Sequence, residues 1–293
     1  MGKFFVAISM ILSGVTYSQG DIQIAQKHLE NGDIKKSKII LESRLKSNPN
    51  DEKAILLLGD IASFEKNWDV ALSNYKKLLN NDPGNADFNF RYGGVLGLKA
   101  ITVSRIKAVV YIPDIKKYLE KATELDPQHI KSRRALVELY MQLPGLLGGS
   151  EAKAQRFANE LKKIAPLEGA LSHAYILKQT GKENEAKNLV QKALDKITSP
   201  YTSSSQNYLN YEFGKIAAEY NIDHQQGLKL LDAYIANYNY KDMHAPEWAY
   251  YRKAQIHHQL DNKSEATKFI DKALALNSDF EEAKLEKKKI QKL

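Results

Sequence analysis

Residues 52–85 read EKAILLLGDIASFEKNWDVALSNYKKLLNNDPGN, and this stretch decides the fold. Two small residues, Gly59 and Ala71, stand among larger apolar residues at helical spacing, and Pro83 follows the second apolar run. Two helices approach closely only where their side chains are small, and a proline stops a helix and turns the chain. The stretch therefore predicts two helices packed as a hairpin.

The hairpin matches a known repeat in its residues as well as in its length. Its small, aromatic and apolar residues occupy the signature positions of a unit of about 34 residues, the tetratricopeptide repeat, and the stretch resembles that family. The matching residues are Ile55, Leu58, Gly59, Ala62, Ala71, Tyr75, Leu78 and Pro83. The resemblance covers roughly residues 20–280. It implies an all-α fold, a superhelical solenoid of about six such hairpins with a charged C-terminal capping helix within 280–293.

Other units repeat the pattern with different fidelity. Residues 18–49 form a partial first unit, and residues 167–200 repeat the pattern at the expected spacing. A later unit places Gly214 in its first helix and Leu231 in its second, with a one-residue slip between them. The last unit is marked by Tyr250, Ala254, Ala266, Ile270 and Ala273.

Two insertions interrupt the repeats, near residues 98–113 and 143–150. In the first, Gly93 fits a first helix, but the second helix, with Leu119, arrives ten residues late. The extra segment includes the apolar run 106–112. The second insertion contains Pro-Gly and Gly-Gly-Ser before a helix rich in lysine and alanine, and this stretch resembles a variant seen in exported bacterial repeat proteins. Those include the helical component associated with some periplasmic solute transporters.

The best linker candidate in the chain is the Ser- and Thr-rich stretch at residues 200–205. It either divides units at 19–199 from units at 200–293 or forms a long surface turn, and continuous stacking of repeats favours the turn.

The N-terminus has the features of a secretory signal peptide. Lys3 precedes an apolar run over residues 4–15, and small residues at Thr16 and Ser18 stand where a signal peptidase cuts. We expect residues 1–18 to be removed and the remaining protein to be soluble, since no later segment has the apolar length that a membrane span needs. The chain has no cysteine, which excludes disulfides and thiolate metal sites and favours a bacterial periplasm or exterior.

The sequence gives little support for catalysis. None of its seven histidines forms a metal-binding pair at helical spacing, and no nucleophile or phosphate-loop motif is present. The net charge of +8 includes a lysine-rich end that is typical of a solvated terminal helix. We therefore expect no enzyme activity, no cofactor, no metal and no nucleic-acid partner.

The resemblance instead implies a binding surface. In the family the first helices of successive units line a concave groove. The family's ligand-facing positions carry over to Leu171, Tyr175, Tyr208, Tyr211, Lys215, Trp248, Tyr251 and Gln255. Tyrosine and tryptophan are common in binding hot spots, although each of these rings could equally pack between units.

Two functions follow as hypotheses. The first is a non-catalytic scaffold in the bacterial envelope that binds a protein or peptide in the groove. The alternative is an accessory component of a periplasmic solute transporter that binds a small apolar ligand or forms a homo-oligomer, suggested by the apolar insertion near Val109 and the Gly-Gly-Ser loop.

Overall fold

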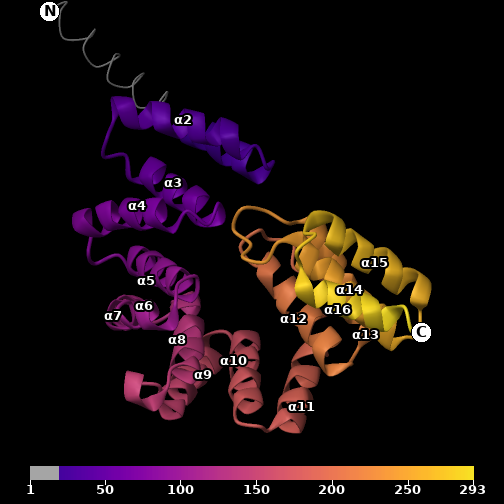
Figure 1. Ribbon diagram of the computed structural model, residues 1–293. Coiled ribbons are helices and arrows are strands. Elements are labelled where there is room, and N and C mark those ends of the chain that lie inside the picture. Colours follow the sequence, from indigo (N-terminus) through magenta and orange to yellow (C-terminus); the bar gives the residue numbers. More distant parts are fainter. Residues whose placement is uncertain (1–19) are drawn as a thin grey trace, which may run out of the picture. The chain divides into compact units, whose positions relative to one another are not determined.

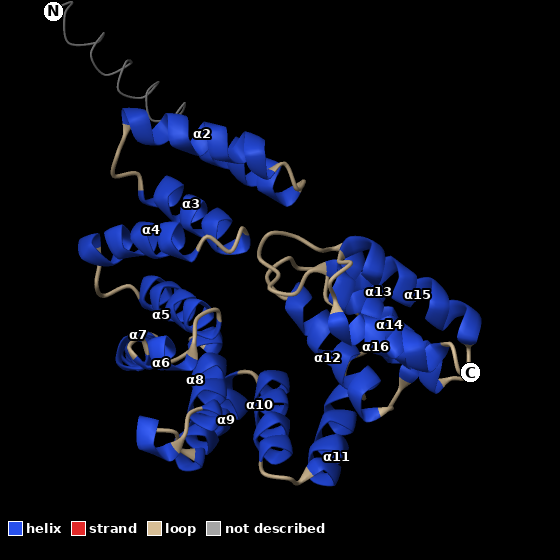
Figure 2. Ribbon diagram, viewed as in Figure 1, coloured by secondary structure: helices blue, strands red, loops and turns tan. Residues whose placement is uncertain are grey.

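The structure is a computed structural model that describes residues 20–293, so the predicted signal peptide lies outside the described residues. The described residues form helices and connecting loops without a strand (Figure 2). Residues 20–30 are helical. The helices that follow are α2 (Ile34–Ser47), α3 (Glu52–Phe64), α4 (Trp68–Asn81), α5 (Ala86–Ile101), α6 (Arg105–Val109), α7 (Ile112–Leu125), α8 (Ile130–Gln142), α9 (Glu151–Ile164), α10 (Pro166–Gln179), α11 (Glu183–Leu194), α12 (Asn207–Tyr220), α13 (His224–Ala236), α14 (Pro246–Gln259), α15 (Lys263–Leu276) and α16 (Glu281–Ile290). This composition confirms the predicted all-α helical-repeat solenoid.

Two compact units divide the chain between Lys153 and Ala154, near the start of α9. In the first unit, the hairpins α3–α4 and α5–α7 stack on each other, with α2 packed before them and α8 after them (Figure 1). In the second unit, the hairpins α10–α11, α12–α13 and α14–α15 follow in order, and α16 packs on the last of them. The predicted C-terminal capping helix is therefore present as α16.

Apolar residues from both helices of each hairpin fill the cores of the units. In the first unit, Ile55 of α3, Tyr75 of α4 and Phe88 of α5 belong to one buried cluster. In the second, a larger cluster extends from α10 to α14, and a further cluster joins α14, α15 and α16. Helical periodicity of apolar residues predicts such cores, because each helix must bury one stripe.

Glycine marks the closest approach of the two helices in three hairpins. A β-carbon at Gly59 would lie 2.5 Å from Cε1 of Tyr75, and one at Gly214 would lie 2.5 Å from Cγ of Leu231. A β-carbon at Gly93 would lie 3.0 Å from Cβ of Tyr118 and 3.3 Å from Cγ of Leu119, which is a tight but less severe approach. The paired residues are 16, 17 and 26 residues apart respectively for Gly59, Gly214 and Gly93. The one-residue slip and the ten-residue insertion therefore leave the helix contact in place, as the sequence predicts.

The insertions lie outside these contacts. Residues 98–113 form the last turn of α5, the short helix α6 and the start of α7, and no residue of α6 is buried. Residues 143–150 form a loop with a 3-10 turn at Gly145–Leu147. No helix in the described part of the chain has the length and apolar character required to span a bilayer.

The Ser- and Thr-rich stretch at residues 200–205 lies inside the second unit, between α11 and α12. Asn210 of α12 contacts this stretch through two hydrogen bonds. Its Oδ1 accepts from the backbone N–H of Tyr201 at 2.9 Å, and its Nδ2 donates to the backbone carbonyl of Tyr201 at 2.8 Å. Asn207, also on α12, donates to the Asp242 carboxylate at 2.9 Å. The two contacts of Asn210 hold Tyr201 of the stretch against α12, and the contact of Asn207 holds the loop before α14. The division of the repeats into blocks at residue 199 stays a prediction.

The glycine contact predicts opposite effects for two glycine substitutions. Gly59→Ala should lower the free energy of unfolding by about 1–3 kcal/mol, because the new methyl group overlaps the Tyr75 ring. Gly97→Ala, in α5 with nothing within 4 Å of the new methyl group, should raise it by about 0.5–1 kcal/mol through helix propensity. Urea denaturation followed by circular dichroism measures both. A stability loss of equal size in the two variants would contradict this account of the hairpin contact.

Candidate functional site

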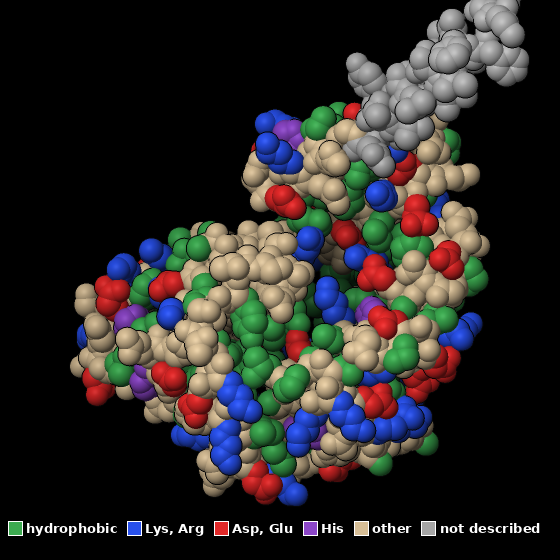
Figure 3. All heavy atoms as spheres, turned by 180° about the vertical axis from the view of Figure 1, so that it is seen from behind, with side chains coloured by type: hydrophobic (Ala, Val, Ile, Leu, Met, Phe, Trp, Pro, Cys, Tyr) green, Lys and Arg blue, Asp and Glu red, His purple; other side chains and the backbone are tan. Residues whose placement is uncertain are grey.

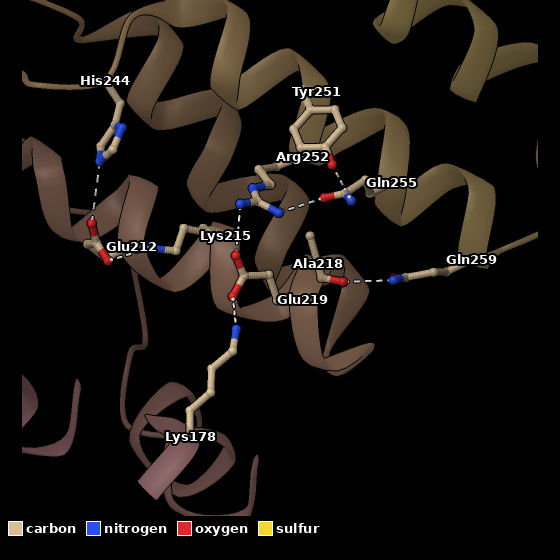
Figure 4. Close-up of polar contacts among 10 residues, drawn as sticks. All are labelled: Lys178, Glu212, Lys215, Ala218, Glu219, His244, Tyr251, Arg252, Gln255 and Gln259. Carbon is tan, nitrogen blue, oxygen red and sulfur yellow. Dashed lines mark hydrogen bonds and ion pairs between the residues drawn. The ribbon is translucent and has the colours of Figure 1, made fainter. Parts of the chain in front are cut away.

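The first helices of the three hairpins in the second unit are α10, α12 and α14, and one carboxylate links all three. Lys178 of α10 donates a hydrogen bond to Oε2 of Glu219 at 3.0 Å, and Arg252 of α14 donates from Nη2 to Oε1 of the same carboxylate at 2.8 Å. Figure 4 shows these side chains converging on Glu219 at the C-terminal end of α12. The three first helices are thereby fixed to one another by charge as well as by packing.

The polar network continues along α14. Nη1 of Arg252 donates to Oε1 of Gln255 at 2.9 Å, and Nε2 of Gln255 donates to the Tyr251 hydroxyl at 2.9 Å. One turn further, Gln259 donates to the carbonyl of Ala218 on α12 at 2.7 Å (Figure 4). Side chains with several rotatable bonds are thus held in single positions across two neighbouring first helices.

A second group of contacts lies nearer the start of α12. Glu212 accepts a hydrogen bond from Lys215 at 3.2 Å and lies 3.8 Å from the imidazole of His244. The His244 ring, from the loop before α14, stacks on Tyr211 with 4.3 Å between ring centroids. This loop therefore covers Tyr211, whose exposed fraction is 1%.

The charges around Glu219 determine its ionisation. Burial raises the pKa of this carboxyl, but the Arg252 guanidinium, followed by the ammonium groups of Lys215 and Lys178, outweighs burial and leaves the pKa below its ordinary value of 4.5. The side chains of Glu219 and Arg252 are 22% and 12% exposed. At neutral pH the cluster is therefore an ionised network, in which Arg252 is mostly covered and the Lys178 side chain, 44% exposed, lies open to water.

The structure places the eight predicted groove residues in two environments. Leu171, Tyr211 and Tyr251 are buried and pack in the apolar clusters of the second unit. The partly exposed residues are Tyr175, Tyr208, Lys215, Trp248 and Gln255. Of the eight, Lys215, Tyr251 and Gln255 belong to the polar network described above (Figure 4). Partner binding by any of the eight stays a prediction.

Sequence reasoning missed the residues at the centre of the network, Lys178, Glu219 and Arg252. A signal was available, since Lys178 and Glu219 occupy the last turns of two successive first helices and carry opposite charges. Lys178 lies three residues after Tyr175, at a ligand-facing position of the family, but Glu219 and Arg252 are at no such position, and Arg252 lies in the middle of α14 rather than at its end.

Two other features of the described residues lack the geometry of a site. Within the described residues no three His, Asp or Glu side chains are grouped in a way that could hold a metal ion. In the first unit, a shallow hollow beside α4 and α7 is lined mostly by polar side chains, including Lys76, Lys117 and Glu124. Neither feature has the converging, mutually fixed side chains that surround Glu219.

Comparisons with known proteins identify the repeat. The family model of the tetratricopeptide repeat matches residues 249–280, which span most of α14 and α15. A tetratricopeptide-repeat protein of known structure from Parabacteroides merdae is 13% identical, with a TM-score of 0.54 over 94% of this chain and 98% of that chain. A thermophilic one from Thermus thermophilus is 19% identical, with a TM-score of 0.51 over 61% of this chain and 91% of that chain. The APC/C hetero-tetramer Cut9–Hcn1 contains a chain that is 12% identical, with a TM-score of 0.58 over 91% of this chain and 48% of that chain. No curated protein matches the sequence.

These matches agree with the hairpins, the glycine contacts and the capping helix. Residues 249–280 match the tetratricopeptide-repeat family model, and the described part of the chain has the fold of tetratricopeptide-repeat proteins of known structure. At such low identities the structural likeness concerns the fold. The local resemblance of residues 143–166 to a component of solute transporters stays a prediction.

The ion network gives a stability prediction with a defined pH dependence. Glu219→Gln should lower the free energy of unfolding by about 1 kcal/mol at neutral pH, because two cations lose a charged hydrogen-bond acceptor that is partly open to water. Since the folded-state pKa of Glu219 is lowered, this contribution is present above the pKa of the unfolded chain and is lost as pH falls through the folded-state pKa. Urea denaturation at neutral and at acidic pH measures the difference between variant and wild type, which should shrink in acid.

Glu281→Gln is the matched control. The Glu281 carboxylate is exposed and pairs with Lys284 on the same helix, so its removal should change stability little at any pH. Equal losses for the two variants at neutral pH would show that the Glu219 network contributes nothing beyond surface charge.

Proposed function

We propose that this protein is a non-catalytic scaffold that binds a protein or peptide along α10, α12 and α14 of its second unit. The observation that carries the proposal is the single carboxylate of Glu219, which fixes three successive first helices to one another. A surface whose side chains are already fixed loses little conformational entropy when a partner binds.

The residues around this network suit contact with a polypeptide. Tyr175, Tyr208 and Trp248 are partly exposed on the same three helices, and their rings provide large contact areas with few rotatable bonds. Lys215 and Gln255 add polar groups that are held in place by hydrogen bonds. The fold itself is one that binds proteins, and one of the compared structures is a hetero-tetramer.

The cellular location of the scaffold is proposed from the N-terminal sequence. A lysine before the apolar run 4–15 and a small residue at Ser18 support export by a signal peptidase route. A chain without cysteine is suited to a compartment where thiols would be oxidised. We place the protein in the envelope of a bacterium or outside the cell.

Binding along the first helices predicts a difference between two double variants. Lys215→Ala with Gln255→Ala removes two partly exposed side chains from α12 and α14, and should weaken partner binding by at least about tenfold. Lys229→Ala with Gln225→Ala removes the same residue types from α13, the second helix of one hairpin, and should leave binding unchanged. Quantitative pull-down from the source organism, followed by titration of the retained partner, measures both. Equal retention by the two variants would contradict the assignment.

Export predicts the N-terminus of the mature protein. Protein recovered from a fractionated bacterial culture should begin at Gln19 and appear in the periplasmic or extracellular fraction, because the cut follows Ser18. Mass spectrometry of the intact protein measures this, with Ser18→Leu as the variant that should block the cut at this position. A chain that retains Met1 and stays in the cytoplasmic fraction would refute export.

A further inference from the structure

The insertion after α5 exposes a group of large apolar side chains. Ile101, Ile106 and Val110 are 75%, 86% and 77% exposed, and Val109 is exposed as well. We call residues 101–110 the insertion tip. Soluble proteins seldom place several large apolar side chains together in water unless the surface binds something.

The fold gives no reason for these side chains. The hairpin contact between Gly93 and Leu119 forms on either side of the insertion, and no residue of α6 contributes to the core. A polar loop of the same length would connect the two helices equally well. The apolar composition of the insertion tip is therefore available for an interaction outside the hairpin.

All charged residues in the sequence around the insertion tip, from residue 88 to residue 113, are basic. Between Asp87 and Asp114 the sequence has no Asp or Glu, but it contains four basic residues, Arg91, Lys99, Arg105 and Lys107. Two of them are paired, since Arg91 contacts Asp60 and Asp87, and Lys99 contacts Asp69 of α4.

Arg105 and Lys107 have no such pairing. Both side chains are exposed in the insertion tip, and no hydrogen bond or ion pair joins either of them to another described residue. They flank Ile106, the most exposed apolar residue of the tip. Unpaired cations beside protruding apolar side chains are complementary to a surface that has negatively charged groups on its outside and an apolar layer below them.

We propose that the insertion tip docks the protein on an anionic lipid membrane. Apolar side chains that protrude can enter the boundary between headgroups and acyl chains, to a depth of about 5–10 Å, while flanking Lys and Arg contact anionic headgroups. A stable protein interface usually buries about 800 Å² on each partner, more than a tip of four apolar side chains provides. The inference is independent of the proposed protein-binding function, which uses α10, α12 and α14.

On the face of the molecule drawn in Figure 3 the charges are mixed. In Figure 3, Lys and Arg side chains are interspersed with Asp and Glu over the face that is shown. The net charge of +8 attracts the chain to anionic surfaces in general, and the unpaired cations of the insertion tip add a local attraction beside its apolar side chains.

The absence of cysteine allows a direct test in the full chain. Ile106→Cys, labelled with an environment-sensitive fluorophore, is the probe, and Leu276→Cys, at an exposed apolar position on α15, is the matched control. Each is mixed with vesicles of phosphatidylcholine alone or of phosphatidylcholine with phosphatidylglycerol. We expect the label at residue 106 to become brighter and blue-shifted on the anionic vesicles, whereas the label at residue 276 stays unchanged.

The cations are tested in the same assay. Arg105→Gln with Lys107→Gln should raise the lipid concentration needed for half of the signal by roughly thirtyfold, since each cation near an anionic surface strengthens binding by about fivefold. Lys53→Gln with Lys77→Gln removes equal charge from exposed sites on α3 and α4 and should have little effect. The proposal is overturned if the label at residue 106 does not respond to anionic vesicles, if neutral vesicles give the same response, or if only an added protein changes its emission.

Discussion

The structure depends on the close approach of two helices at a position that has almost no side chain. At Gly59 the ring of Tyr75 occupies the space that a β-carbon would need, and at Gly214 the side chain of Leu231 does the same. Such a contact fixes the spacing and the rotation of the two helices, because ridges of one helix must fit grooves of the other. Each hairpin then exposes the same faces to its neighbours, and stacking can continue.

Stacking brings successive first helices together, and both units join them with the same device. In the first unit Asp60 of α3 pairs with Arg91 of α5, and Tyr75 donates to the same carboxylate at 2.6 Å. In the second unit Glu219 of α12 pairs with Arg252 of α14. Partly shielded ion pairs specify geometry more than they add stability, since desolvation offsets much of the attraction. Their position between first helices keeps the face on which we place the partner in one arrangement.

The sequence predicted what depends on spacing along the chain. The repeat near Gly59, the late second helix after Gly93 and the slip before Leu231 all follow from the order of small and apolar residues, and the structure confirms them. The capping helix follows from its charge and position. These features depend on residues close together in the sequence, so a single sequence is enough to predict them.

What the sequence did not predict depends on contacts between elements. Tyr211 was selected by its family position, but His244 from a later loop stacks on it and buries it. Loops have no periodicity, so nothing in the sequence placed that histidine there. The pairing of Glu219 with Arg252 likewise requires the register of two helices that belong to different hairpins.

New interactions can arise in the connection between the two helices of a hairpin. Residues between the helices of a hairpin are free of the packing constraint, provided that the glycine contact still forms, as it does between Gly93 and Leu119 across the longer connection. The closing of a longer flexible loop costs only slightly more entropy, so an insertion is tolerated at small cost to stability. The side chains of the insertion tip are therefore not selected by the fold. Exposed isoleucine and valine beside the unpaired Arg105 and Lys107 combine an apolar surface with positive charge, which is why we assign this segment to an anionic membrane.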